Sequence, residues 1–186
     1  MSIDVSVSVA DLYYVPEHGK AEIIDGELVR FMPTGRRPNR AASRIWRSLD
    51  DYEQTHVGGV AVSDNAGFTV NLPHRESFSP DAAWYIGPFD AADEMDFFNG
   101  APAFAAEVRS KNDYGRLAEA AIAAKRRDYF AAGTLVVWDV DLLSEDVIKA
   151  YRADNADTPA IYRRGDLATA EPAVPGWQMP VDELFR

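Results

Sequence analysis

The fold is decided by the stretch Ala103-Phe104-Ala105-Ala106-Glu107-Val108-Arg109-Ser110. Its apolar start predicts a central β-strand over residues 103–109, because short continuous apolar runs are typical of strands buried on both faces. An Ala-rich helical pattern follows over 117–132 and ends at Gly133, a position where helices commonly take a glycine. A second apolar run over 135–140 predicts another central strand. This order of strand, helix and strand indicates an α/β (α+β) fold, a mixed sheet flanked by helices.

The N-terminal half supplies the rest of the expected sheet and a further helix. Asp25-Gly26 between two apolar runs predicts a β-hairpin over about 20–32. Apolar residues at helical spacing predict a helix over 39–55. We expect strands near 60–64, 67–72 and 78–86, followed by a loop with Gly and Pro over 87–102.

The C-terminal quarter is expected to complete the same domain with shorter elements. Residues 147–151 and 161–163 have the pattern of edge strands, and residues 181–185 that of one helical turn. No internal repeat, low-complexity segment or linker divides the sequence. The 186 residues therefore predict a single domain over 1–186.

Composition and charge restrict the kinds of site. The chain has no cysteine and three histidines, so disulfides and thiolate-rich metal sites are excluded, and a metal should be a hard cation held by carboxylates. A net charge of −11 argues against a simple nucleic-acid binder, although an acidic enzyme can bind nucleic acid through one groove. A secretory pattern and a membrane-length apolar run are both missing, so we expect a cytoplasmic protein without membrane contact.

Two acidic residues stand out because of their place in the predicted strands. Glu107 ends an apolar run, where a buried charge is costly unless it is paired or binds a metal. Asp81 follows Pro80 in an earlier strand. Two carboxylates from neighbouring strands could share a divalent cation of the kind used in phosphodiester hydrolysis. The alternative is an ordinary buried salt bridge of Glu107 with Arg109 or Lys125.

Basic residues form two further features. Arg40, Arg44 and Arg47 fall on one face of the predicted helix and either contact phosphates or form a solvated face offset by nearby acidic residues. Lys125 lies on an otherwise apolar and aromatic face of the later helix. Its amine therefore either extends past the core to solvent or points at an anionic group.

Taken together, several segments resemble a bacterial family, the Uma-two family of putative restriction endonucleases. The resemblance covers nearly the whole chain, and its specificity comes from the order of the segments. They are Leu12-Tyr13-Tyr14, Ala21 to Leu28, Met32-Pro33, Pro80-Asp81, Gly100 to Pro102, Ala106 to Ser110, Lys125 to Tyr129, Ala132-Gly133, Val137 to Val140, Pro175-Gly176 and Asp182 to Phe185.

The resemblance implies a nuclease core of the PD-(D/E)XK type with a site inside it. Asp81 and Glu107 would hold Mg²⁺ or Mn²⁺, as one or two ions, and Glu22 would lie near them. The position two residues after the glutamate usually holds lysine and here holds Arg109, so the lysine role would pass to Lys125. Similar proteins look like homodimers, which implies a homodimer here.

These expectations combine into a leading hypothesis and two rivals. The leading one is a metal-dependent DNA endonuclease in which Lys125 stabilises the developing negative charge or orients the attacking water. One rival is a catalytically inactive, nuclease-like dimer that binds nucleic acid or a protein partner, which Arg109 and the acidic balance favour. The other is hydrolysis of a different phosphate ester, since a fold does not fix a function.

Overall fold

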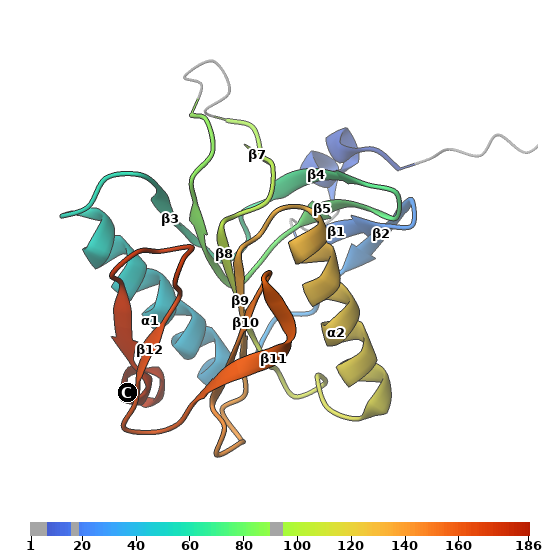
Figure 1. Ribbon diagram of the computed structural model, residues 1–186. Coiled ribbons are helices and arrows are strands. Elements are labelled where there is room, and N and C mark those ends of the chain that lie inside the picture. Colours follow the sequence, from blue (N-terminus) through green and yellow to red (C-terminus); the bar gives the residue numbers. More distant parts are fainter. Residues whose placement is uncertain (1–6, 16–18, 90–94) are drawn as a thin grey trace, which may run out of the picture.

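A six-stranded mixed sheet with one long helix on each face forms the centre of the computed structural model, which describes residues 7–15, 19–89 and 95–186 (Figure 1). The helices are α1 (Arg36–Glu53) and α2 (Arg116–Ala131). In the order β11-β10-β9-β8-β6-β3, the strands are β11 (Asn155–Tyr162), β10 (Ile148–Arg152), β9 (Val136–Val140), β8 (Phe104–Val108), β6 (Ala82–Tyr85) and β3 (Val60–Ser63). Strands β8 and β9 are parallel and α2 connects them, as expected for a crossover unit.

A second, five-stranded sheet lies beside α2 and carries the N-terminal hairpin (Figure 1). In the order β2-β1-β5-β4-β7, its strands are β2 (Glu27–Arg30), β1 (Ala21–Ile24), β5 (Arg75–Phe78), β4 (Phe68–Leu72) and β7 (Phe98–Asn99). The chain passes from this sheet to the six-stranded one through Ser79-Pro80-Asp81, between β5 and β6. Asp81 therefore lies at the junction of the two sheets.

The ends of the chain form short elements at the edges of the molecule. A 3₁₀ helix, η1 (Val9–Tyr14), precedes the hairpin. The C-terminal segment adds a two-stranded sheet of β12 (Leu167–Thr169) and β13 (Gln178–Pro180), followed by the 3₁₀ helix η4 (Val181–Phe185), which packs against α1.

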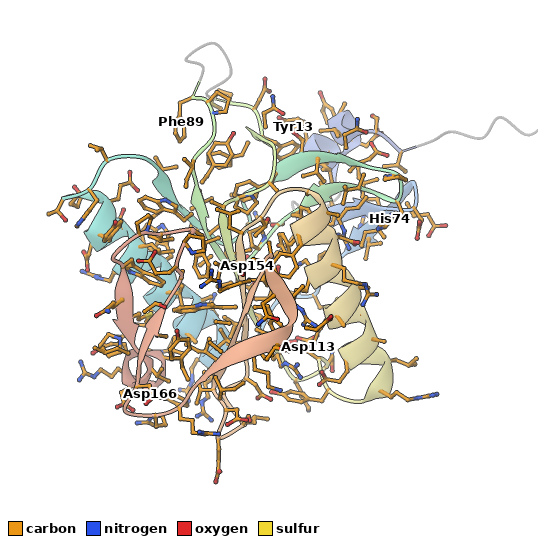
Figure 2. All side chains as sticks on the ribbon, viewed as in Figure 1. Tyr13, His74, Phe89, Asp113, Asp154 and Asp166 are labelled. Carbon is orange, nitrogen blue, oxygen red and sulfur yellow. The ribbon has the colours of Figure 1, made fainter. Side chains whose placement is uncertain are left out.

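Alternation along the central strands divides the apolar side chains into two cores, one on each face (Figure 2). In β8, Phe104, Ala106 and Val108 join the core under α1 and the C-terminal segment. Ala105 joins the core shared with α2 and the five-stranded sheet. Because side chains alternate, Glu107 also points to the α2 side, where it contacts the Tyr129 hydroxyl and the Lys125 ammonium.

The predicted fold class is confirmed, and three details of the sequence interpretation are wrong. The expected single strand over 78–86 is interrupted at Pro80, whose missing N–H suits a break between strands. The segment 147–151, expected at an edge, is β10 and lies between β9 and β11. The expected loop 87–102 contains β7, which pairs in parallel with β4.

Among the described residues, no helix combines the length and apolar character that crossing a bilayer requires.

Candidate active site

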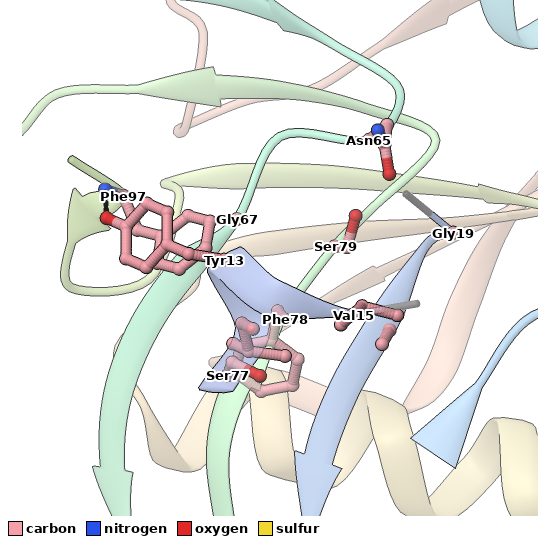
Figure 3. A pocket seen from close by; sticks show the side chains of 11 residues that line it. Tyr13, Val15, Gly19, Asn65, Gly67, Ser77, Phe78, Ser79 and Phe97 are labelled. Carbon is pink, nitrogen blue, oxygen red and sulfur yellow. Dashed lines mark hydrogen bonds between the residues drawn. The ribbon is translucent and has the colours of Figure 1, made fainter. Parts of the chain in front are cut away.

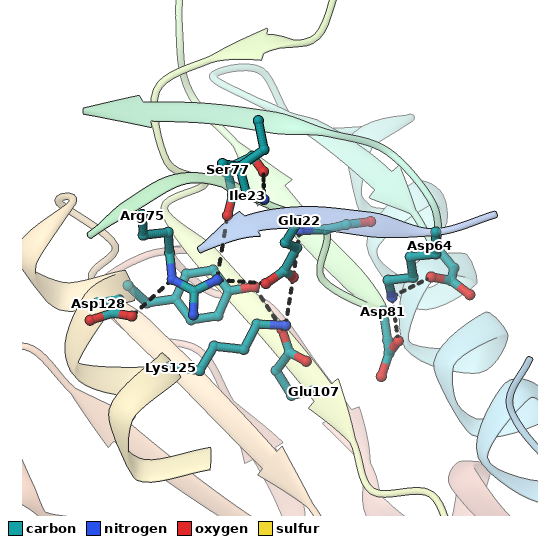
Figure 4. Close-up of polar contacts among 12 residues, drawn as sticks. Glu22, Ile23, Asp64, Arg75, Ser77, Asp81, Glu107, Lys125 and Asp128 are labelled. Carbon is teal, nitrogen blue, oxygen red and sulfur yellow. Dashed lines mark hydrogen bonds and ion pairs between the residues drawn. The ribbon is translucent and has the colours of Figure 1, made fainter. Parts of the chain in front are cut away.

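Glu107 lies near the end of β8, with its carboxylate turned toward α2 (Figure 4). Its Oε1 accepts a hydrogen bond from the Tyr129 hydroxyl at 2.6 Å and lies 2.8 Å from the Lys125 ammonium. The side chain is 27% exposed, so one side of the carboxylate reaches solvent. Burial raises the pKa of Glu107, and the charges of Asp81 and Glu22 raise it further against the opposing effect of Lys125 and Lys20.

The Lys125 amine bridges two carboxylates from different sheets. Its Nζ lies 2.8 Å from Glu107 Oε1 and 2.8 Å from Glu22 Oε1. Burial lowers the pKa of Lys125, but the two carboxylates outweigh this and the pKa is raised, so the amine stays charged. The Lys125 amine therefore lies against Glu107, a contact that the relocated lysine and the alternative salt bridge both require, and its second carboxylate partner is Glu22.

Glu22 is fully buried in β1 and is held by three donors. Besides Lys125, its carboxylate accepts from Arg75 Nη1 at 2.6 Å and from the backbone N–H of Ser79 at 3.0 Å. Arg75 also donates to Asp128 of α2 at 2.8 Å. This network attaches α2 to the five-stranded sheet and fixes the position of Lys125, because a buried carboxylate is stable only when its partners are in place.

Asp81 adjoins the backbone that follows Glu107. Its Oδ2 accepts from the backbone N–H of Val108 at 2.7 Å, and its Oδ1 lies 2.9 Å from the ammonium of Lys20. Lys20 also contacts Asp64 at 2.7 Å. Burial lowers the pKa of Lys20, yet the charges of Asp81, Glu107 and Asp64 raise it overall, so this amine too is charged.

The charges of the site are unbalanced toward negative. Arg75 is matched by Asp128, which leaves two ammonium groups, Lys20 and Lys125, facing four carboxylates, those of Glu22, Asp64, Asp81 and Glu107. A hard divalent cation would suit this all-oxygen set. In the part of the chain that the structure describes, no three potential ligands converge on one point. Two partly exposed carboxylates nevertheless fit Mg²⁺, which proteins commonly bind through one or two carboxylates plus substrate phosphates.

Arg109 belongs to a separate ion cluster beyond the end of β8. Its Nε and Nη2 donate to the two oxygens of Asp139 at 2.6 and 2.7 Å, and its Nη1 and Nη2 donate to Glu119 of α2. The hydrogen bonds to Asp139, opposed by burial and aided by Glu119, raise the pKa of Arg109. None of its contacts involves Glu107, so the alternative pairing of these two residues is absent.

The three candidate arginines of α1 lie on the other face of the six-stranded sheet. The buried residues of α1 belong to the core opposite the one under α2. Arg40 donates to the backbone carbonyl of Arg186 at 3.0 Å, and Arg44 lies 3.7 Å from the carboxylate of Glu183. Arg47 is exposed. This face therefore borders the C-terminal segment, and its contact with nucleic acid stays a prediction.

Sequence reasoning missed several residues that contact the predicted ones or their partners, among them Lys20, Asp64, Arg75 and Tyr129. Two of them had a readable signal. Lys20 and Glu22 share one side of an extended segment because side chains alternate, and Tyr129 lies one helical turn after Lys125. Arg75 was hidden by the failure to separate β5 from β6, and Asp64 lies in an acidic turn that looks ordinary.

Comparison with known proteins agrees with this architecture. A putative nuclease from Anabaena variabilis, described as belonging to DUF820, superposes with a TM-score of 0.73 at 17% sequence identity, over 96% of this chain and 97% of that one. At this identity, the likeness shows a shared fold. No relative was found among curated proteins. The sequence profile of Uma2, described as "Putative restriction endonuclease", matches residues 9–182, so the chain belongs to the Uma2 family.

Proposed function

We propose that the protein is a metal-dependent endonuclease that hydrolyses phosphodiester bonds in DNA. The observation that carries the proposal is the excess of carboxylates at the junction of the two sheets, where Asp81 and Glu107 are partly exposed. Family membership supports nuclease chemistry in general. The proposal adds to this general nuclease chemistry a dependence on a divalent metal ion and DNA as the substrate.

Asp81 and Glu107 would hold Mg²⁺ or Mn²⁺, as one or two ions. When bound, such an ion polarises the phosphate and readies a water nucleophile. The raised pKa of Glu107 supports this role, because a partly buried carboxylate beside other carboxylates gains from a nearby cation. Lys20, which contacts Asp81 and Asp64, would release Asp81 to the ion and keep its contact with Asp64.

Lys125 would supply positive charge to the phosphate. Its pKa is raised, so it cannot act as a general base near neutral pH, but its ammonium can stabilise negative charge that develops on the phosphate oxygens. Glu22 and Tyr129 position this amine and the Glu107 carboxylate, respectively. Arg109, whose guanidinium is directed to Asp139 and Glu119, is assigned a positioning role at the start of α2.

A nuclease-like binding module is the second candidate, because a specific observation favours it. Asp81 and Glu107 already contact ammonium groups, so each is partly neutralised by the chain itself. In such a module the same residues would serve as a structural ion network. A homodimer stays a prediction for both candidates, and light scattering that shows a monomer at working concentration would remove it.

One pair of measurements separates the candidates. Calorimetric titration with Mg²⁺ and with Mn²⁺ should give binding to the native protein and none to Glu107→Gln. Cleavage of single- and double-stranded DNA should require the same ions and the same carboxylate. The matched control is Asp154→Asn, which removes a carboxylate from an exposed surface ion pair. Native protein that binds no divalent cation and cuts no DNA would favour the binding module.

A further inference from the structure

A cavity of about 190 Å³ lies beside the proposed active site, between η1 and the five-stranded sheet (Figure 3). Its floor is formed by buried residues, Val15, Ser77, Phe78 and Ser79, and its rim includes the exposed Tyr13, Gly19 and Asn65. A pocket of roughly 150 Å³ accommodates a benzene ring, and drug-sized ligands need about 300 Å³ or more. The space therefore suits a single planar ring system.

The cavity combines an aromatic wall with polar groups. Tyr13 and Phe97 stack with ring centroids 4.1 Å apart. The Tyr13 hydroxyl accepts from the backbone N–H of Phe97 at 2.9 Å and donates to Asp96 at 3.2 Å, so the ring is held in place. The Phe97 ring lies so close to Gly67 that a Cβ there would come within 2.4 Å of it. The wall is thus rigid before any ligand binds.

Ser79 supplies the second observation that points to a ligand. The residue is 3% exposed, lines the cavity, and its hydroxyl has no hydrogen-bond partner among the described residues. A buried hydroxyl without a partner costs about 1–3 kcal/mol, so such groups usually have a purpose. The Ser77 hydroxyl accepts from the backbone N–H of Ile23 at 2.9 Å and keeps its own proton to donate.

The same chain segments that line the cavity also carry the proposed active site. Gly19 and Ala21 flank Lys20, and Asn65 follows Asp64. Ser79 precedes Asp81 by two residues, and its backbone N–H donates to Glu22. Since successive Cα atoms are about 3.8 Å apart, the cavity lies within the span of a nucleotide or two from the carboxylates.

We infer that this cavity binds one nucleobase of the DNA strand whose phosphate occupies the site; the inference rests on the proposed function. Tyr13 stacks on the base, and the amide of Asn65, an exposed residue at the rim, bonds to the edge of the base. Stacking on aromatic side chains tolerates every base, whereas hydroxyl and amide contacts discriminate among base edges. The base reaches the cavity either from an unpaired strand or by extrusion from a duplex.

The test measures the affinity of the metal-free protein for a short single-stranded oligonucleotide and for versions with one abasic residue at successive positions. One position should weaken binding by about 5- to 150-fold when its base is removed, the range for a single stacked base. In Tyr13→Leu and in Asn65→Gly that difference should shrink. Asn65→Gly is compatible with the fold because Asn65 has φ 69°, a value that glycine adopts without strain.

The matched control is Tyr14→Ala, a neighbouring tyrosine that is 82% exposed and does not line the cavity. It should keep the full difference between intact and abasic strands. A second experiment with duplex DNA shows how the base reaches the cavity. Tighter binding of a duplex that is mismatched at the sensitive position indicates extrusion of the base from the duplex. Binding of single strands alone indicates that the base comes from an unpaired strand.

Affinity that is independent of abasic position, or equally altered in Tyr13→Leu and Tyr14→Ala, overturns the base-binding cavity. If intact and abasic strands are then cut at equal rates in Mg²⁺, the nuclease proposal stands without it. A position-dependent affinity with no cleavage keeps the cavity and rejects the nuclease. Absence of any DNA binding rejects both.

Discussion

Glu107 and Arg109 are two residues apart at the end of β8, and both side chains contact α2, yet their surroundings differ in kind. Arg109 directs its guanidinium to Asp139 and Glu119 in a planar, two-pronged geometry. Glu107 is partly exposed, and its ion partner is an ammonium group, which makes a single point contact. Arg109 makes paired hydrogen bonds to both of its carboxylates, whereas Glu107 has one ammonium partner and a side chain that is 27% exposed.

This difference indicates how a structural ion pair and a proposed reactive one can lie next to each other at the end of one strand. A planar pair that satisfies its own donors has little to offer a substrate. A set of carboxylates held by lysines can exchange partners, because an ammonium is a compact charge on a flexible stem. We therefore expect substitutions in the Glu107 cluster to act mainly on cleavage and those in the Arg109 cluster mainly on stability.

The largest expected effect comes from Glu107→Gln. The variant keeps the shape of the side chain but loses the charge that would hold the ion, so DNA cleavage should fall by about 10³-fold or more. Because burial raises the pKa of Glu107, the neutral amide should leave the melting temperature nearly unchanged or raise it. Rate and melting temperature are measured on the same preparation. Retained cleavage would place the chemistry elsewhere.

The second prediction tests the contrast between the two clusters by replacing the cation of each one with methionine. Arg109→Met leaves Asp139, which is 4% exposed, buried without its cation and should lower the free energy of unfolding by about 3–5 kcal/mol. Lys125→Met should lower cleavage by about 10- to 100-fold, more than Arg109→Met does when rates are compared per folded molecule. Denaturant unfolding and single-turnover rates give both quantities. Equal effects of the two variants on cleavage would end the proposed distinction.

A smaller effect is expected from Tyr129→Phe. The Tyr129 hydroxyl donates to Glu107 Oε1 at 2.6 Å, and its removal should lower the free energy of unfolding by about 1–2 kcal/mol. Cleavage should fall only severalfold, because Lys125 still contacts the carboxylate. Calorimetric titration should show weaker Mg²⁺ binding than in the native protein. An unchanged ion affinity would mean that Tyr129 has no part in positioning Glu107.

Charge reversal on α1 should have a modest effect. Arg40→Glu, Arg44→Glu and Arg47→Glu remove positive charge from a face away from Glu107, and each should weaken DNA binding slightly and flatten its dependence on salt. Affinity measured over a salt series gives the slope. Identical slopes for native protein and variants would assign this face to solvent and to the C-terminal segment, which Arg40 and Arg44 contact.

The smallest predicted effect concerns pH and Glu119. Hydrogen bonds from Arg109 lower the pKa of Glu119 below its ordinary 4.5, so the pair stabilises the protein above that pH and loses its effect as the pH falls through the folded-state pKa. The difference in stability between native protein and Glu119→Gln should therefore shrink on acidification. Since Glu119 is 52% exposed, screening keeps the difference small. A difference that grows on acidification would contradict the pairing.

Local sequence patterns predicted which helices and strands form, but they did not predict which of these elements lie next to each other. The apolar run before Glu107, the Ala-rich helix and Asp25-Gly26 each specify their structure through nearby residues, and all three elements are present. The break at Pro80 was missed because the apolar residues on both sides of it look like one strand. The position of β10 inside the sheet depends on its pairing with β11, and a local pattern does not show which strands pair.

The candidate site was predictable only in part for the same reason. Glu107 and Lys125 could be recognised because each is a charge on an otherwise apolar face. That Lys125 meets Glu22 depends on how the five-stranded sheet approaches α2, and the pairing of Lys20 with Asp64 and Asp81 joins segments far apart in sequence. Periodicity assigns a residue to a face, but it does not say which residue of another sheet lies opposite.

The attachment of α2 to both sheets has a consequence for how the protein unfolds. The helix is tied to the five-stranded sheet through Asp128–Arg75 and Lys125–Glu22, and to the six-stranded sheet through Lys125–Glu107 and Glu119–Arg109. Local unfolding of either sheet must therefore detach the same helix, which couples the two sheets into one cooperative unit. A partly folded intermediate that lacks one sheet has no assembled cluster, so the proposed active site exists only when both sheets are folded.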